Sequence, residues 1–366
     1  MLDFAFEYRL EDFHLAPALT TGRAVTALYG PSGAGKSLTL LCLVGLRRPS
    51  RGYIRLNGRT LFDSTAGIHL SPHLRRMGLV FQEYALFPHL TVASNLAYGL
   101  RDSSRAEIQE RVQAMLRLLR LDAFGDRYPG ELSGGQRQRV ALGRGLIIQP
   151  ELLLLDEPFS ALDQMERERL RDEVLELLQG FGGTTILVTH NLQEAYLMAR
   201  QIAVIDGGRI LQAGTRDEVL QHPRTRRVAE HVGVTNIFQG TVADAGAGRP
   251  VIAWYGEQLT CMTSLPPPGT SVEFCIRPED VRLVWPEKAA ERPNVLRGHL
   301  TAEVERGVDY LLKFRGDGQA VEAGEIEIHC SEHLHYLMKL HPGMQVSIAL
   351  PPDKLHILSP VDRTRD

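Results

Sequence analysis

The sequence contains no long apolar run. Its longest strongly apolar stretch, residues 38–46, has about half the length that a membrane-spanning helix needs. The first residues, MLDFAFEYRL, include an acidic residue at position 3 and no basic segment, so we expect no secretory signal. The sequence therefore predicts a cytoplasmic protein whose contact with any membrane is made through a partner.

Cysteine is also scarce. The 4 cysteines, Cys42, Cys261, Cys275 and Cys330, show neither a CxxC pair nor a Cys/His spacing typical of metal sites. This pattern favours scattered buried thiols in a reducing compartment over a metal centre. No metal bound through cysteine is expected.

Strong net charge is absent, and lysine is rare. With 41 basic and 44 acidic residues the net charge is −3, which gives no reason to expect nucleic acid as the main partner. Across the first 287 residues every basic residue except Lys36 is an arginine, apart from the histidines. That exception needs a chemical reason.

The 366 residues suffice for two or three domains, and a composition of 43% apolar and 23% charged residues is ordinary for a globular protein. From residue 1 to about 235, apolar runs at 24–30, 77–82, 151–158 and 184–190 alternate with helical patterns, which indicates an α/β domain with a largely parallel sheet. One helix is expected over 163–182, stopped by Gly180 and Gly182. Residues 236–366 are turn-rich and predict a small, mainly β domain or a pair of half-barrels, with a short helix within 329–343.

The stretch 30–37 fits the pattern GxxxxGK[ST], with a strand before it and an apolar helix after it. In such a loop, successive backbone N–H groups and the helix N-terminus face the phosphates of a nucleotide. A compact lysine ammonium fits inside that ring where a planar guanidinium would not, which accounts for Lys36. This context favours a nucleotide site over a glycine turn that binds nothing. The predicted nucleotide-binding residues are Gly30, Pro31, Ser32, Gly33, Ala34, Gly35, Lys36 and Ser37, and Ser37 is also placed to hold Mg²⁺.

Two carboxylates end the strand at 151–158. Asp156 is expected to hold Mg²⁺, and Glu157 to orient and deprotonate the attacking water. Two acids after a strand are more often a helix cap or surface charge, but the phosphate loop upstream favours a catalytic site.

The next motif makes a family resemblance specific. Residues 132–136, LSGGQ, resemble the signature motif of ABC ATPases, and a serine and glycines at a helix start form a second anion site. The resemblance covers about residues 1–235. It implies that Ser133, Gly134, Gly135 and Gln136 contact the γ-phosphate of ATP held by a second copy, so that a head-to-tail dimer encloses two ATP molecules.

Three further positions follow the family pattern. The resemblance implies that Gln82 senses magnesium and the membrane partner, that Asp163 in the segment 160–163 crosses the dimer interface, and that His190 contacts the γ-phosphate. By itself, a histidine at a strand end is more often structural. Lys36, Gln82, Glu157 and His190 form the predicted catalytic set, with Ser37, Gln82 and Asp156 around the metal.

Two features match less closely. The family stacks adenine on an aromatic residue near the N-terminus, for which Tyr8 and Phe13 are candidates, with core packing as the alternative for either. Gly143 and Gly145 lie where the family often has alanine, and each costs up to about 1 kcal/mol of helix propensity.

Only about 50 residues separate Gln82 from the signature, which suits a compact helical subdomain at about 85–140. The resemblance to transporters of this family implies that this subdomain forms a groove for a membrane subunit. ABC ATPases that act on nucleic acid or ribosomes usually carry longer insertions or a second cassette. Residues 87–96 resemble bacterial importers, and 274–281 resemble an importer TOBE domain. The half at about 292–358 and the stretch 61–76 resemble molybdate importers.

The resemblance therefore implies an ATPase on the cytoplasmic face of a membrane, peripheral to it. It predicts as partners a second copy of the chain, two permease subunits and, indirectly, a solute-binding protein. Molybdate is the expected cargo, with sulfate, tungstate, iron and polyamine as alternatives. A soluble ABC ATPase acting on nucleic acid or ribosomes remains the rival class. The C-terminal domain is expected to stabilise the dimer, with anion sensing as the alternative.

Overall fold

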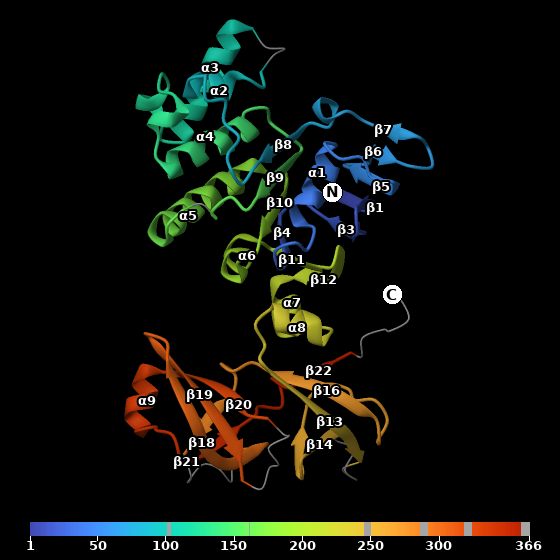
Figure 1. The fold of residues 1–366 in the computed structure, drawn as a ribbon, viewed down its shortest axis with the longest axis vertical. Coiled ribbons are helices and arrows are strands. Elements are labelled where there is room, and N and C mark those ends of the chain that lie inside the picture. The colour runs from blue at the N-terminus through green and yellow to red at the C-terminus, as the bar shows by residue number, and fades with distance from the viewer. Residues whose placement is uncertain (101–103, 161, 245–249, 286–291, 318–323, 360–366) are drawn as a thin grey trace. The chain divides into compact units, whose positions relative to one another are not determined.

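The computed structural model describes residues 1–100, 104–160, 162–244, 250–285, 292–317 and 324–359. They form two compact units, Met1–Asp217 and Glu218–Asp366 (Figure 1). Within the described ranges, no helix combines the length and the apolar character needed to cross a membrane.

The first unit contains two sheets and the helices around them. Its strands are β1 (Leu2–Leu10), β2 (Phe13–Leu15), β3 (Ala18–Thr21), β4 (Val25–Tyr29), β5 (Arg51–Leu56), β6 (Arg59–Asp63), β7 (Ile68–His69), β8 (Met77–Val80), β9 (Leu152–Asp156), β10 (Thr184–Thr189), β11 (Gln201–Asp206) and β12 (Arg209–Thr215). Its α-helices are α1 (Lys36–Val44), α2 (Val92–Ala97), α3 (Arg105–Leu118), α4 (Gly134–Leu146), α5 (Gln164–Phe181) and α6 (Leu192–Met198). Short 3₁₀ helices lie at Pro72–Leu74, Asp122–Phe124 and Pro129–Glu131.

The predicted parallel sheet is confirmed. Its strand order is β12-β11-β4-β10-β9-β8, and every pairing is parallel except the β11–β12 edge hairpin. The four predicted runs correspond to β4, β8, β9 and β10. The strands β9 and β10 are almost wholly buried, as expected for a sheet covered on both faces.

A second, antiparallel sheet was not foreseen. It has the order β2-β1-β5-β6-β7, with β3 also paired to β1. Alternate residues of β1, Leu2, Phe4 and Phe6, are buried and share one apolar cluster with α1 and the parallel sheet. This sheet therefore covers the helix that follows the phosphate loop.

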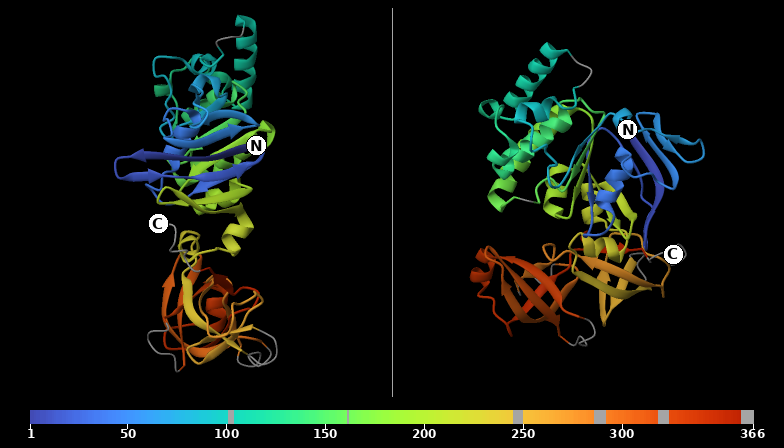
Figure 2. Two further views of the ribbon diagram at one scale, coloured as in Figure 1. Left: turned by 90° about the vertical axis from the view of Figure 1, so that its right-hand side faces the viewer. Right: turned by 45° about the horizontal axis from the view of Figure 1, so that its top comes forward.

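Helices α2, α3 and α4 have an apolar cluster of their own. Within the first unit they gather on the side opposite the β5–β7 strands (Figures 1 and 2). The structure accounts for Gly143, because a Cβ atom there would lie 2.4 Å from Leu119 and 2.9 Å from Leu96. Close packing of α4 against α2 and α3 is thus the reason for that glycine.

The helix expected over 163–182 is α5, but only one of its two predicted stops is correct. Gly182 adopts the left-handed conformation with φ 63° and ends the helix, whereas Gly180 lies inside it. Of the two glycines, only Gly182 takes the positive φ of a left-handed helix cap, so the helix continues through Gly180 to Phe181.

The second unit is mainly β, as predicted. Its helices are α7 (Arg216–Gln221), which begins at the end of the first unit, α8 (Arg226–His231) and α9 (Glu332–Met338). Its strands are β13 (Asn236–Asp244), β14 (Pro250–Trp254), β15 (Glu257–Thr260), β16 (Ser271–Ile276), β17 (Arg282–Val284), β18 (Val295–Glu305), β19 (Asp309–Gly316), β20 (Ile326–Ser331), β21 (Gln345–Ala349) and β22 (His356–Leu358). They form two antiparallel sheets, β15-β14-β13-β16-β22 and β17-β21-β18-β19-β20, around one apolar cluster. The short helix expected within 329–343 is α9.

The boundary between the compact units lies between Asp217 and Glu218, whereas the sequence changes from the alternating pattern to a turn-rich one near residue 236. The interval between these two points contains α8 and most of α7. The guanidinium of Arg277 donates to the carbonyls of Leu220 and Val232, and His356 contacts the carbonyl of Pro223. These contacts attach the interval to the β strands of the second unit.

Candidate functional site

The parallel sheet brings together segments that are far apart in the sequence. The phosphate loop follows β4, Gln82 follows β8, Asp156 ends β9 and His190 follows β10. Because these strands are parallel neighbours, their carboxyl ends lie along one edge of the sheet. Ligands of open α/β sheets bind at that edge.

The phosphate loop has the backbone that its glycines predict. Gly33 and Gly35 have φ of 80° and 98°, in the left-handed region that favours glycine. A Cβ atom on Gly30 would lie 2.0 Å from the carbonyl oxygen of Ile205, so this position also excludes a side chain. The loop ends at the N-terminus of α1, where backbone N–H groups attract anions.

The ammonium group of Lys36 lies inside this loop. Its Nζ atom donates to the carbonyls of Gly30 at 2.9 Å and Pro31 at 2.8 Å, and the side chain is 5% exposed. Burial lowers the pKa of Lys36, while the carboxylates of Glu157 and Asp156 act to raise it. The cation is therefore held where phosphate oxygens would approach.

Ser37 and Asp156 meet across 119 residues of sequence. The Ser37 hydroxyl donates to Oδ1 of Asp156 at 2.8 Å. Burial raises the pKa of Asp156, whereas the hydrogen bond from Ser37 lowers it. Within the described ranges, no group of three or more His, Cys, Asp or Glu side chains could hold a metal ion. A hydroxyl beside one carboxylate nevertheless suits Mg²⁺, which takes its other ligands from phosphate and water.

Glu157 lies between a cation and an imidazole. Its Oε1 is 3.8 Å from Nζ of Lys36, and its Oε2 is 3.0 Å from Nδ1 of His190. The residue has φ 43°, a strained value for a side chain of this kind, while its backbone N–H donates to Val188 on the adjacent strand. The strain and the contacts together aim this carboxylate at the phosphate loop.

Gln82 lines a cavity of about 610 Å³ that Tyr84, Arg137 and Ser160 also line. The hydroxyl of Ser160 donates to the backbone carbonyl of Glu157 at 3.0 Å. The cavity is therefore joined to the carboxylate site through the segment after β9.

The predicted second anion site is separate from the first within this chain. Ser133 caps α4, and its Oγ accepts a hydrogen bond from the Gln136 backbone at 3.3 Å. A cavity of about 240 Å³ at this helix end is lined by residues of α4 and α5 and their flanks, and none of its lining residues belongs to 30–37. Gly134 begins α4, and a Cβ on Gly135 would meet no atom within 4 Å.

The two aromatic candidates differ in position. A Cβ on Gly35 would lie 3.2 Å from the ring of Phe13, so that ring lies against the phosphate loop. Tyr8 pairs with Leu15 on β2, and both Tyr8 and Phe13 pack against the apolar cluster. The remaining predicted residue, Asp163, caps α5 by accepting from the Glu166 backbone at 2.9 Å. Ala161, in the same segment, lies outside the described residues.

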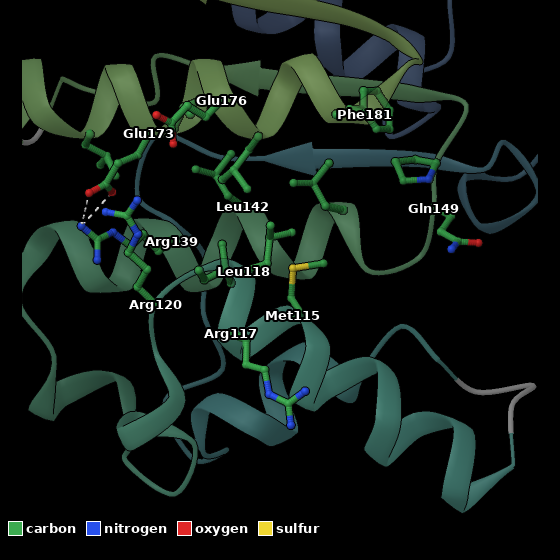
Figure 3. A pocket seen from close by; sticks show the side chains of 17 residues that line it. Met115, Arg117, Leu118, Arg120, Arg139, Leu142, Gln149, Glu173, Glu176 and Phe181 are labelled. Atoms are coloured by element: carbon green, nitrogen blue, oxygen red, sulfur yellow. Dashed lines mark hydrogen bonds and ion pairs between the residues drawn. The ribbon is translucent and has the colours of Figure 1, made fainter.

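A larger cavity lies elsewhere in the first unit. It measures about 940 Å³ and lies among α3, α4, α5 and the turn at Gln149. Figure 3 shows its mixed apolar and charged lining and, at one end, the ion pair of Arg139 with Glu173, whose closest atoms are 2.7 Å apart. None of the predicted site residues lines it.

Three polar residues next to the site were not predicted from the sequence. Thr189, Glu194 and Arg167 line a small cavity together with Glu157 and His190. One signal was available: Asn191 caps α6, and a glutamate three residues after a cap is a common helix-start pattern. That pattern predicts a helix start and does not indicate that Glu194 is buried near the site.

Comparisons with known proteins agree with this geometry. Residues 19–160 match the family described as ABC transporter, and residues 274–358 match the TOBE domain family. The putrescine transport ATP-binding protein PotG of Escherichia coli is 45% identical over 222 residues, which cover 60% of this chain and 57% of PotG. The molybdenum import ATP-binding protein ModC of Paramagnetospirillum magneticum is 36% identical over 299 residues, which cover 81% of this chain and 82% of ModC.

One solved structure is similar to the first unit. The dimeric post-hydrolysis structure of the ATP-binding cassette MJ0796, bound to ADP and Pi, has a TM-score of 0.50 and 27% identity, covering 59% of this chain and 99% of that chain. The match to PotG leaves much of that relative uncovered, whereas the match to ModC spans most of both chains. The chain therefore belongs to the ABC transporter family, as an ATP-binding subunit of the importer type with a C-terminal TOBE domain, and such subunits are ATPases.

Proposed function

We propose that this chain is the ATP-hydrolysing subunit of a bacterial-type import complex at the cytoplasmic face of a membrane. The observation that carries the proposal is the group Lys36, Ser37, Asp156, Glu157 and His190, which the parallel sheet collects at one edge. ABC subunits of this kind function as dimers with membrane permease subunits. Two copies of this chain with two permeases, and a solute-binding protein acting on them, are the proposed assembly.

In the proposed mechanism the residues have distinct tasks. The loop 30–37 holds the phosphates, and Lys36 neutralises charge on them. Glu157 orients and deprotonates the attacking water, while His190 supports the γ-phosphate and the Glu157 side chain. The positions of Lys36 and His190 on either side of the Glu157 carboxylate support these assignments.

Ser37, Asp156 and Gln82 are the proposed holders of Mg²⁺. When bound, the ion would supply charge neutralisation on the phosphate oxygens. The hydroxyl–carboxylate pair supports this assignment. The support for Gln82 is its place at the end of β8, on the same sheet edge.

The signature residues Ser133, Gly134, Gly135 and Gln136 are proposed to contact ATP held by the second copy, with Asp163 at the same interface. The separation of the two anion sites within one chain supports this arrangement. ATP binding would close the dimer, and loss of the γ-phosphate would let it reopen. A dimeric solved relative bound to ADP and Pi is consistent with that cycle.

The proposed cargo is an oxyanion, with molybdate as the best candidate. A ModC relative is among the similar proteins, but importers of sulfate, iron and polyamine are at least as similar, so the relatives do not single out molybdate. The PotG relative is 45% identical, so a polyamine stays an alternative, as do sulfate, tungstate and iron. Asn294, in the stretch similar to molybdate importers, donates to Leu350 and accepts from the Thr260 backbone, which is a structural task. For the second unit, stabilisation of the dimer stays the preferred role, with anion sensing as the alternative.

The test is an ATPase assay followed by reconstitution. The purified chain should release phosphate from ATP only with Mg²⁺, and vesicles holding its co-purified permease should hydrolyse ATP faster when molybdate-loaded binding protein is supplied. Stimulation by sulfate, putrescine or ferric iron instead would reassign the cargo. Stimulation by DNA or RNA with no permease co-purifying would favour the soluble class of ABC ATPase.

A further inference from the structure

A small polar cavity lies behind the Glu157–His190 pair. Its volume is about 50 Å³, and its lining residues are Glu157, Ser160, Arg167, Thr189, His190, Asn191 and Glu194. A polar space of this size has room for about one to three water molecules. Every lining residue is polar, so water within it would find hydrogen-bond partners.

Glu194 forms one wall of this cavity and holds the turn that carries His190. Its carboxylate is nearly buried, at 7% exposure, and its Oε2 accepts a hydrogen bond from Thr189 Oγ1 at 2.5 Å. The same hydroxyl accepts from the Asn191 backbone at 3.0 Å, and Asn191 Oδ1 accepts from the Glu194 backbone at 3.2 Å. The residues on both sides of His190 are thus tied to Glu194.

Arg167 lines the same cavity and holds the segment that follows Glu157. Its Nη2 atom donates to the backbone carbonyl of Leu162 at 3.2 Å, next to the α5 cap at Asp163. Its Nε atom is buried and has no hydrogen-bond partner among the residues that the structure describes. A buried donor of a charged group is costly to leave unpaired, and the nearly buried Glu194 carboxylate lines the same cavity.

We propose that Arg167 and Glu194 are positioning residues, bridged by water in this cavity, that make residues 157–160 and 162–163 and the turn bearing His190 move as one unit. Their hydrogen bonds go to residues 162, 189 and 191, and residues 30–37 do not line this cavity. They act by setting the distance between His190 and Glu157, and by positioning Asp163, which is proposed to lie at the dimer interface. The inference rests on the proposed function, because its effect is on ATP hydrolysis.

The test is a double-mutant cycle on steady-state hydrolysis with Arg167→Gln, Glu194→Gln and the double variant. Each single change should lower kcat by about tenfold while KM for ATP stays within about twofold, since the phosphate loop is unchanged. The double variant should be no slower than the slower single variant. Conservative changes should retain more activity, Arg167→Lys more than Arg167→Gln.

Arg171→Gln is the matched control. Arg171 lies on the same helix, its guanidinium pairs with the adjacent Asp172 at 3.2 Å, and it does not line this cavity. It should leave kcat unchanged. Thermal unfolding of every variant separates loss of folding from loss of positioning, and the cycle is repeated with Arg167→Lys and Glu194→Asp if a glutamine variant fails to fold.

The outcomes separate this inference from the proposed function. A wild-type chain that hydrolyses no ATP, alone or with its permease, removes the proposed function. A wild-type chain that hydrolyses ATP, with single effects that multiply in the double variant or with unchanged kcat in Glu194→Gln, overturns the inference alone. An experimental structure at high resolution should show water joining Arg167 Nε to Glu194, and a dry cavity with these groups apart would contradict the bridge.

Discussion

The Nδ1 atom of His190 lies 3.0 Å from Oε2 of Glu157, although 33 residues separate the two in sequence. Glu157 follows β9 and His190 follows β10. Because these two strands are parallel neighbours, both residues lie at the same sheet edge. The other carboxylate oxygen faces Lys36 at 3.8 Å. Glu157 is therefore held from two sides and cannot rotate freely away from the phosphate loop.

Replacing Glu157 with glutamine should separate ATP binding from hydrolysis. The side chain keeps its size but loses its basicity, so phosphate release should fall by about 100-fold to 10,000-fold. ATP should still bind, because Lys36 and the loop glycines are unchanged, and a closed dimer should accumulate on size-exclusion chromatography with ATP. Near-normal turnover would remove Glu157 from the catalytic role.

Ser133→Arg should prevent the ATP-dependent dimer while leaving ATP binding by each chain intact. A long cation at the start of α4 would occupy the second anion site. The control is Ser104→Arg, since Ser104 caps α3 with the same kind of capping box. Both changes should cost about 1 kcal/mol of stability through the lost cap. Only Ser133→Arg should abolish dimerisation, and an ATP-stable dimer of that variant would count against the shared nucleotide site.

Phe13→Ala should weaken ATP binding by about tenfold, which corresponds to the loss of one aromatic–base stack. Both rings pack against the apolar cluster, and the Phe13 ring also lies against Gly35 of the phosphate loop. Tyr8→Ala should therefore affect thermal stability more than affinity. Calorimetric titration of both variants with ATP distinguishes them, and equal affinities for Phe13→Ala and wild type would assign Phe13 to core packing.

Gly143→Ala should lower the free energy of unfolding by about 1–3 kcal/mol. The new methyl group would lie 2.4 Å from Leu119, and the packed helices cannot move apart without losing contacts. Gly180→Ala is the control, because a Cβ there meets nothing within 4 Å and the position is helical. That change should be neutral or stabilising by up to about 1 kcal/mol. Urea unfolding measures both, and equal effects would refute the packing explanation.

Removal of Mg²⁺ with EDTA should abolish hydrolysis, and Asp156→Asn should raise the Mg²⁺ concentration that gives half-maximal activity. Burial raises the pKa of Asp156 above that of an ordinary aspartate. Protons compete with the cation for this carboxylate, so the Mg²⁺ requirement of the wild type should rise on acidification, starting at a higher pH than for an exposed aspartate. In Asp156→Asn this rise of the Mg²⁺ requirement on acidification should disappear. A magnesium requirement unaffected by this substitution would argue against Asp156 as a ligand.

Much of the site could be predicted from the sequence because its parts are locally encoded. A glycine pattern with Lys36 and Ser37 specifies its own backbone, and the apolar runs before Asp156 and His190 specify buried strands. Parallel pairing of such strands then leaves few positions for the residues at their ends. The sequence could not predict which of Gly180 and Gly182 ends the helix. Both glycines suit a helix end, and only the observed φ distinguishes them.

Other features depend on contacts between distant segments. The antiparallel sheet of β1, β5 and β6, the burial of Glu194, the place of Arg167 in a shared cavity and the preference for Phe13 over Tyr8 beside Gly35 all came from the fold. The amino-acid sequence by itself determined the order of the phosphate, carboxylate, signature and histidine motifs, since each is a short pattern with its own steric or electrostatic logic. Only the tertiary structure decided which polar side chains become buried neighbours, because burial depends on how whole sheets and helices pack together and not on any local spacing.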